Sequence, residues 1–111
     1  MARGDIVLVP FPFTDLTGQK RRPALVVSPE GFDPQDLILC AITSRIPGRP
    51  IAWDVPLDAT DLVIGALPRP SVIKVGKLFT MHRALVFGLF GQVQPQKIEQ
   101  VLATLQRLFG H

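Results

Sequence analysis

Residues 4–28 read GDIVLVPFPFTDLTGQKRRPALVVS, and this stretch decides the class of fold. The runs IVLV and ALVVS inside it are short, rich in β-branched residues and without helical periodicity. They predict strands over residues 4–11 and 24–28, because such residues pack well on a pleated sheet. The polar, glycine-containing stretch at 13–22 indicates a loop between them.

Short apolar runs predict the other strands, and a change of period predicts one helix. The expected strands span residues 37–43, 51–57, 72–75 and 84–93. From Pro95 to Phe109 apolar residues recur at i, i+3, i+4 and i+7, which predicts an amphipathic helix with Thr104 on its polar face and Gly110 at its end. Short strands with turn-rich corners and a terminal helix favour a mainly β chain, folded over residues 1–111 as one small β-barrel domain.

Composition narrows the class of protein. Of the 111 residues 47% are hydrophobic and 19% are charged, which argues for a folded domain rather than a disordered chain. Apolar runs reach only about six residues, far short of the roughly 20 that a membrane helix needs. Cys40 is the single cysteine, so no internal disulfide forms, which suits a reducing cytoplasm. Two histidines and one cysteine have no zinc-ligand spacing, so we expect neither a metal nor a cofactor.

The basic residues favour an anionic partner. Lysine and arginine together number 12 against 9 acidic residues, a net charge of +3. Eight of the 12 are arginine. Because a guanidinium binds phosphate bidentately and stacks on bases, this bias favours nucleic acid, although a charge of +3 is also ordinary for a protein surface.

A cationic cluster precedes the second expected strand. Lys20, Arg21 and Arg22 are consecutive, and a proline follows them directly. Three adjacent cations at a loop–strand junction can bind a phosphate, or they can form a solvated basic turn.

A second polar cluster ends the strand LILCAIT. Thr43 and Ser44 are followed by an arginine, and this combination can hold a phosphate through hydrogen bonds and charge. The same hydroxyls can instead satisfy neighbouring backbone groups. Two further residues are candidates for proton transfer: His82, which otherwise lies in a surface turn, and Asp15, which otherwise forms part of a loop.

The order of these segments resembles the MazF/PemK (Kid-like) family of bacterial toxin ribonucleases. GDIVLVPFPFTDLTGQKRRPALVVSP comes first, followed by LILCAITS, DVPLD, PSVIKV and the amphipathic helix. The resemblance covers residues 3–109, and its most specific parts are GDIVLV and KRRPALVVS. It implies an SH3-like barrel that forms a homodimer and is held in check by a small antitoxin protein. It also implies metal-independent, sequence-selective cleavage of single-stranded RNA by 2′-hydroxyl attack, which leaves 2′,3′-cyclic phosphate and 5′-hydroxyl ends and inhibits translation and growth.

The resemblance also assigns roles to single residues. The arginine of the family's R-P pair is Arg22, which is expected to stabilise the transition state. The threonine of the T-S pair is Thr43, which is expected to hold the scissile phosphate. Contacts to RNA are expected from Lys20, Arg21, Ser44 and Lys74.

One departure from the family pattern concerns proton transfer. Many members read K/R-x-D-Q where this chain has Lys74-Val75-Gly76-Lys77, so the carboxylate is replaced by Gly76. His82 or Asp15 can substitute for it. The alternative is a non-catalytic toxin or binding module on the same fold, similar to the CcdB-like toxins, which inhibit a protein target without cutting nucleic acid.

Overall fold

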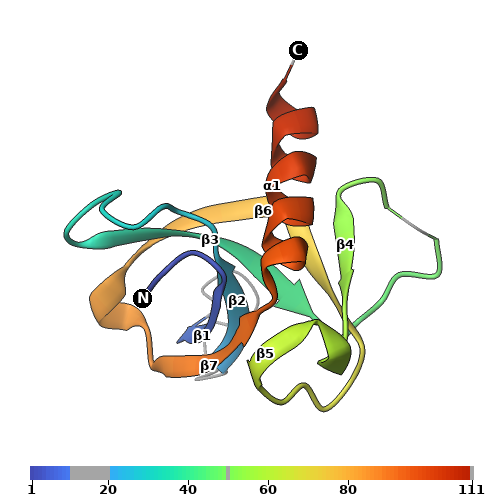
Figure 1. The fold of residues 1–111 in the computed structure, drawn as a ribbon, viewed down its shortest axis with the longest axis horizontal. Helices are drawn as coiled ribbons and strands as arrows, with labels where there is room; N and C mark the ends of the chain where they lie inside the picture. The colour runs from blue at the N-terminus through green and yellow to red at the C-terminus, as the bar shows by residue number, and fades with distance from the viewer. Residues whose placement is uncertain (11–20, 50, 111) are drawn as a thin grey trace.

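The structure is a computed structural model and describes residues 1–10, 21–49 and 51–110; Asp15 and Lys20 lie outside the described residues. Seven strands form one antiparallel sheet in the order β4-β6-β3-β2-β1-β7-β5, and a single α-helix follows them (Figure 1). The elements are β1 (Asp5–Pro10), β2 (Arg21–Val26), β3 (Asp36–Thr43), β4 (Asp54–Leu57), η1 (Ala59–Asp61), β5 (Leu62–Gly65), β6 (Ser71–His82), η2 (Arg83–Leu85), β7 (Gly88–Val93) and α1 (Pro95–Phe109). The predicted mainly β architecture with a C-terminal helix is confirmed.

Several predicted boundaries were wrong. The basic pair Arg21-Arg22 lies inside β2, not in the preceding loop, because it pairs with the end of β1. The prediction missed β5 and the second half of β6, since both carry exposed apolar side chains that local periodicity does not explain. A 3-10 turn, η2, occupies the beginning of the strand predicted over 84–93.

The connection between β4 and β5 makes the sheet curl. These strands are the two edges of the sheet, yet they follow each other in sequence and are joined by residues 58–61 alone. Five Cα–Cα steps separate Leu57 from Leu62, a reach of no more than about 18 Å. The two edges of a seven-stranded sheet can come this close only if the sheet bends round on itself, as Figure 1 shows.

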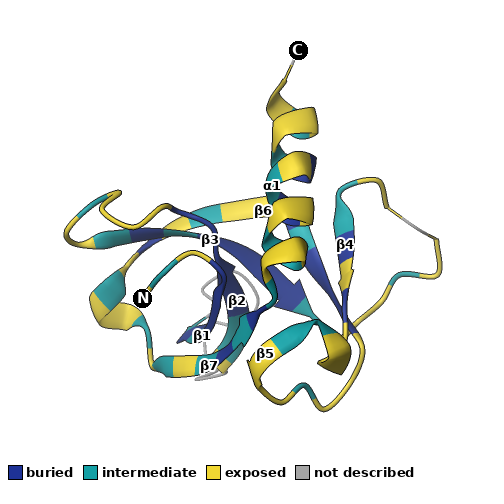
Figure 2. Ribbon diagram, viewed as in Figure 1, coloured by how far each residue is buried: buried dark blue, intermediate teal, exposed yellow. Residues whose placement is uncertain are grey.

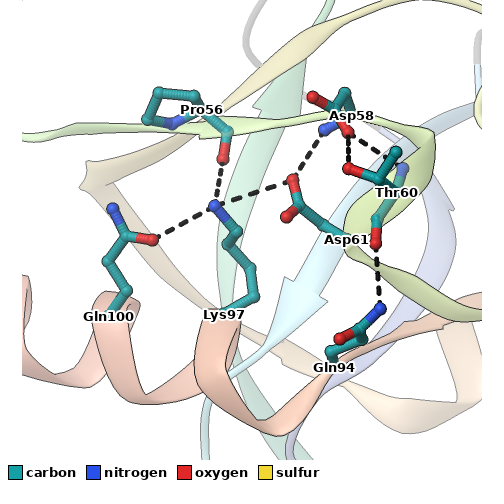
Figure 3. Close-up of polar contacts among 7 residues, drawn as sticks. All are labelled: Pro56, Asp58, Thr60, Asp61, Gln94, Lys97 and Gln100. Carbon is teal, nitrogen blue, oxygen red and sulfur yellow. Dashed lines mark hydrogen bonds and ion pairs between the residues drawn. The ribbon is translucent and has the colours of Figure 1, made fainter.

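Polar contacts fix this connection to α1 (Figure 3). Asp58 caps η1 by accepting hydrogen bonds from the Thr60 hydroxyl and amide, which lower the pKa of Asp58. Lys97 of α1 donates to the Pro56 carbonyl at 2.9 Å and lies 3.6 Å from the Asp61 carboxylate. Three further bonds complete the network: Asp58 N to Asp61, Gln94 N to the Asp61 carbonyl, and Gln94 Nε2 to the Thr60 carbonyl.

The central strands are buried on both faces. One apolar cluster includes Ile6, Leu25 and Val101 of α1, and we call its face of the sheet the inner face. A second cluster, which includes Val7 and Ala24, lies on the opposite, outer face. Figure 2 shows that most of β1, the second half of β2 and most of β3 are buried. Burial on both faces explains why these strands read as unbroken apolar runs instead of alternating with polar residues.

The helix has the predicted boundaries but not the whole predicted pattern. Pro95 occupies its first turn and Gly110 its C-cap. Thr104, predicted on the polar face, is buried because its hydroxyl donates to the Gln100 carbonyl one turn earlier. Phe109, predicted on the apolar face, is 69% exposed, because the end of α1 projects beyond the strands (Figure 1). No helix in the described part of the chain is long and apolar enough to cross a membrane.

Gly65, at the end of β5, provides a test of barrel closure. Its φ is +97°, and an added Cβ would lie 2.6 Å from the Phe90 carbonyl oxygen. We expect Gly65→Ala to lower the free energy of unfolding by about 2 kcal/mol or more, measured by urea denaturation. Gly48→Ala is the matched control, since its Cβ meets nothing within 4 Å and its effect should stay within about 0.5 kcal/mol. Equal effects of the two substitutions would contradict the close approach of β5 and β7.

Cys40 tests the burial of the inner face. It is fully buried in β3, and burial raises the pKa of its thiol to about 12. The thiolate is the reactive form, so iodoacetamide at pH 8 should alkylate Cys40 only when the chain unfolds. Mass spectrometry with and without urea measures this, and rapid labelling of the native protein would overturn it.

Candidate functional site

The register between β2 and β3 brings Arg22 and Thr43 together. Ala24 lies opposite Ala41 in this antiparallel ladder. The paired ladder ends there; continued by two residues along both strands, its register would place Arg22 opposite Thr43, and both residues line the same two hollows. Directly opposed side chains lie on the same face of a sheet, here the outer face. Two residues that are 21 positions apart in sequence therefore become neighbours.

A second row of cross-strand pairs extends the same face. Ala41 also lies opposite Lys74 of β6, and Lys74 lies opposite Asp54 of β4. The Lys74 ammonium is 2.9 and 3.0 Å from the two Asp54 carboxylate oxygens, and both side chains are mostly buried. Lys74, a predicted RNA contact, is thus held by an ion pair. It lies opposite Ala41, which itself lies opposite Ala24, and we call these two small side chains the floor of the site.

Two hollows meet at Arg22 and Thr43. The first hollow has a volume of about 490 Å³ and the second about 550 Å³. The residues lining both are Arg22, Ile42 and Thr43. The first is lined in addition by Leu8, Arg21, Pro23, Ser44, Leu67, Pro68, Arg69, Ser71 and Phe90. The second is lined in addition by Ala41, Arg45, Ile46, Pro47, Lys74 and Lys77. The predicted catalytic pair thus forms the wall between two recesses.

The described residues that line these hollows include six cations and no carboxylate. The ion pair with Asp54 neutralises Lys74. The guanidinium carbon of Arg21 lies 4.0 Å from the centre of the Phe87 ring. The described residues that line the hollows therefore carry a net positive charge. Such a recess attracts phosphates, because low-dielectric walls focus the field of clustered like charges.

The Thr43 hydroxyl has a fixed orientation. Its oxygen accepts the Arg45 amide at 3.1 Å, a contact that turns the chain at the end of β3. This is the local backbone contact that the sequence left open as an alternative. It does not exclude a phosphate, because the hydroxyl hydrogen remains available as a donor.

The structure does not bring His82 to this site. His82 lies opposite Asp36, at the other end of β3 from Thr43, and its Nδ1 accepts the Ala84 amide at 2.9 Å. Seven Cα–Cα steps separate Asp36 from Thr43 along β3, a distance on the order of 20 Å. Within one chain His82 therefore cannot transfer a proton at Arg22 and Thr43, contrary to the possibility raised from the sequence. Asp15 and Lys20 lie outside the described residues.

Lys77 and Arg69 were missed as site residues. Lys77 enters the second hollow because β6 bulges against β3: Cys40 pairs with Leu78 and the adjacent Ala41 with Lys74. The three unpaired residues of β6 bend the strand toward the site. Gly76, within this bulge, has room for a side chain, since an added Cβ would lie 3.7 Å from the nearest atom, the Trp53 Cβ. The absence of the family's carboxylate is therefore not imposed by packing.

Comparison with known proteins assigns this architecture. Residues 2–109 match the family model described as PemK-like, MazF-like toxin of type II toxin-antitoxin system. A search of curated proteins gives no match. Among solved structures, the Mycobacterium tuberculosis toxin MazF-mt6 is similar with 22% identity and a TM-score of 0.74, over 96% of each chain. The MazE-MazF structure from Deinococcus radiodurans has 25% identity and a TM-score of 0.75, over 99% of this chain and 96% of that one. An endoribonuclease with its cognate antitoxin from a mycobacterial species has 20% identity and a TM-score of 0.74, over 99% and 95%.

The ion pair between Lys74 and Asp54 supports the floor of the site. Asp54→Asn should lower the free energy of unfolding by about 1–3 kcal/mol, because it leaves a mostly buried ammonium without its carboxylate. In Asp54→Asn/Lys74→Met both charges are gone, so part of this loss should be recovered. Urea denaturation of the single and double variants measures the coupling, and strictly additive effects would contradict it.

Proposed function

Because this chain belongs to the PemK-like, MazF-like toxins of type II toxin-antitoxin systems, we propose that it is an endoribonuclease that cleaves single-stranded RNA. The observation that carries the proposal is that Arg22 and Thr43 line both of two neighbouring cationic hollows. A chain of phosphates crossing this wall meets donors on both sides and no carboxylate among the described lining residues.

The proposed reaction needs no water in its first step. The ribose 2′-oxygen attacks the adjacent phosphorus while the bond from phosphorus to the 5′-oxygen breaks. The 2′-hydroxyl loses its proton to a base and the leaving 5′-oxygen gains one, so that the products are a 2′,3′-cyclic phosphate and a 5′-hydroxyl. Arg22 stabilises the charge that develops on the phosphorane, and the Thr43 hydroxyl donates to one of its oxygens. Ser44, Arg21 and Lys74 hold the neighbouring backbone.

The proton-transfer groups are the incomplete part of this scheme. A guanidinium is a poor acid, so Arg22 acts through charge. The described lining residues offer neither an imidazole nor a carboxylate. Asp15, five positions before the family's basic segment, stays the candidate base. A substitution of Asp15 by Asn removes the carboxylate with little change in volume.

The partners follow from the family. We expect the chain to form a homodimer in which residues 1–111 of each copy are one toxin domain. We expect a small antitoxin protein as its partner. We expect the protein to act in the cytoplasm, where the RNA is. The Deinococcus radiodurans neighbour is a MazE-MazF structure, and the mycobacterial neighbour is a complex with its cognate antitoxin. An acidic segment that folds on binding suits the cationic hollows of this chain.

RNA cleavage tests the proposal directly. The purified protein is incubated with a mixed-sequence single-stranded RNA in EDTA, and the cleaved ends are mapped. We expect discrete cuts with cyclic phosphate ends. Arg22→Ala and Thr43→Ala should each reduce the rate by about 100-fold or more, because each removes a transition-state donor. His82→Ala should cleave at the wild-type rate, and Asp15→Asn in the same assay tests the candidate base.

Two outcomes would contradict the proposal. If Arg22→Ala and Thr43→Ala both cleaved RNA at the wild-type rate, the catalytic site would lie elsewhere on the protein. Intact RNA in the presence of the folded wild-type protein, together with inhibited supercoiling by DNA gyrase, would favour the non-catalytic module instead. Circular dichroism of each variant separates loss of chemistry from loss of folding.

A further inference from the structure

The segment that carries Arg69 is held in one backbone conformation. Arg69 lies between Pro68 and Pro70, in the connection from β5 to β6. Proline fixes its own φ and restricts the residue before it, so Pro70 limits Arg69. The buried Ser71 hydroxyl donates to the Arg69 carbonyl at 3.2 Å. The position of Arg69 at the edge of the first hollow is thus set before any ligand binds.

The Arg69 side chain differs from the other cations of the first hollow. Arg21 is stacked on Phe87, and Arg22 forms the shared wall with Thr43. Arg69 is exposed, and within the described part of the chain its guanidinium has no hydrogen-bond or ion-pair partner. The five N–H donors of the Arg69 guanidinium are therefore available to a ligand at the rim of the first hollow.

The first hollow combines its cations with an apolar lining that suits a base. Leu8, Leu67 and Phe90 give it an apolar lining, and its volume of about 490 Å³ lies within the usual range of small-molecule sites. The second hollow, with Arg45, Lys74 and Lys77, has the character of a backbone channel. A nucleotide whose phosphate lies at the shared wall has its base one sugar away, at the mouth of the first hollow.

We propose that Arg69 is a specificity-determining residue, which holds the base of a nucleotide next to the scissile phosphate inside the first hollow. The forked guanidinium donates to two acceptors on one edge of the base, and guanine offers such a pair in O6 and N7. Phe90 and the aliphatic side chains contact the face of the base. This inference rests on the proposed function, because RNA must cross the wall formed by Arg22 and Thr43.

The test uses short single-stranded RNAs in which the nucleotides on either side of one scissile bond carry each of the four bases or none. A 2′-deoxy sugar at the scissile position removes the nucleophile, so the affinity can be measured by fluorescence anisotropy without cleavage. The same RNAs with a ribose at that position give cleavage rates. The proteins are the wild type, Arg69→Ala, Arg69→Lys and Arg107→Ala. The last removes an equal charge from α1, where it lines neither hollow.

We expect the wild type to prefer guanine on one side of the scissile bond. Arg69→Ala should weaken binding of that RNA on the order of tenfold, and should not change binding of the abasic RNA. Arg69→Lys keeps the charge but loses the fork, so it should lose the preference for guanine. Arg107→Ala should match the wild type throughout.

Other outcomes overturn the inference. An equal loss for every base and for the abasic RNA would make Arg69 a phosphate contact. A preference for a different base would overturn the contact to O6 and N7. Base selection that depends on Arg69 without any cleavage of the ribose RNAs would contradict the proposed ribonuclease while leaving this inference standing. Cleavage of the ribose RNAs without base selection that depends on Arg69 would support the proposed ribonuclease and contradict this inference.

Discussion

The structure depends on the closure of the sheet at residues 58–61. This segment joins the two edge strands, β4 and β5, which otherwise lie at opposite ends of the strand order. Its four residues form a capped 3-10 turn. Lys97 of α1 and Gln94, the N-cap of the helix, bind this turn through three contacts: the Lys97–Asp61 ion pair and the bond from Gln94 Nε2 to the Thr60 carbonyl (Figure 3), and the bond from Gln94 N to the Asp61 carbonyl. Lys97 also donates to the Pro56 carbonyl of β4 and, within the helix, to the Gln100 side chain. The helix therefore fixes the curvature that places β6 and the β5–β6 connection beside the ends of β2 and β3.

Curvature and register together assemble the site from separate strands. The antiparallel pairing of β2 and β3 brings Arg22 and Thr43 to the same two hollows, while the bulge in β6 brings Lys77 to the second of them. Strands give these side chains more precise positions than loops would, since paired backbones on both sides restrict their movement. Apolar clusters cover the central strands on both faces, and the hollows lie where β2 begins and β3 ends, at Arg22 and Thr43.

The electrostatics of the site favour a bound anion, because the clustered cations repel one another when no anion is present. Cations cluster around Arg22 with no carboxylate among the described lining residues, and their mutual repulsion is relieved when a phosphate chain or an acidic segment enters. Lys74 is the exception, because Asp54 pairs with it and turns it into a support for the floor. At Gly76 an added Cβ would meet its nearest atom, the Trp53 Cβ, at 3.7 Å, so packing does not require a glycine there.

The sequence by itself determined the fold class and the helix from Pro95 to Phe109, because periodicity and order of segments are local properties. It could not reveal β5, whose Val63 and Ile64 are exposed and which forms only by pairing with β7. It could not separate His82 from the site either, since that depends on which end of β3 each residue faces. Register, the bulge in β6 and the closure at 58–61 are set by contacts between distant segments, so only the tertiary structure decided them.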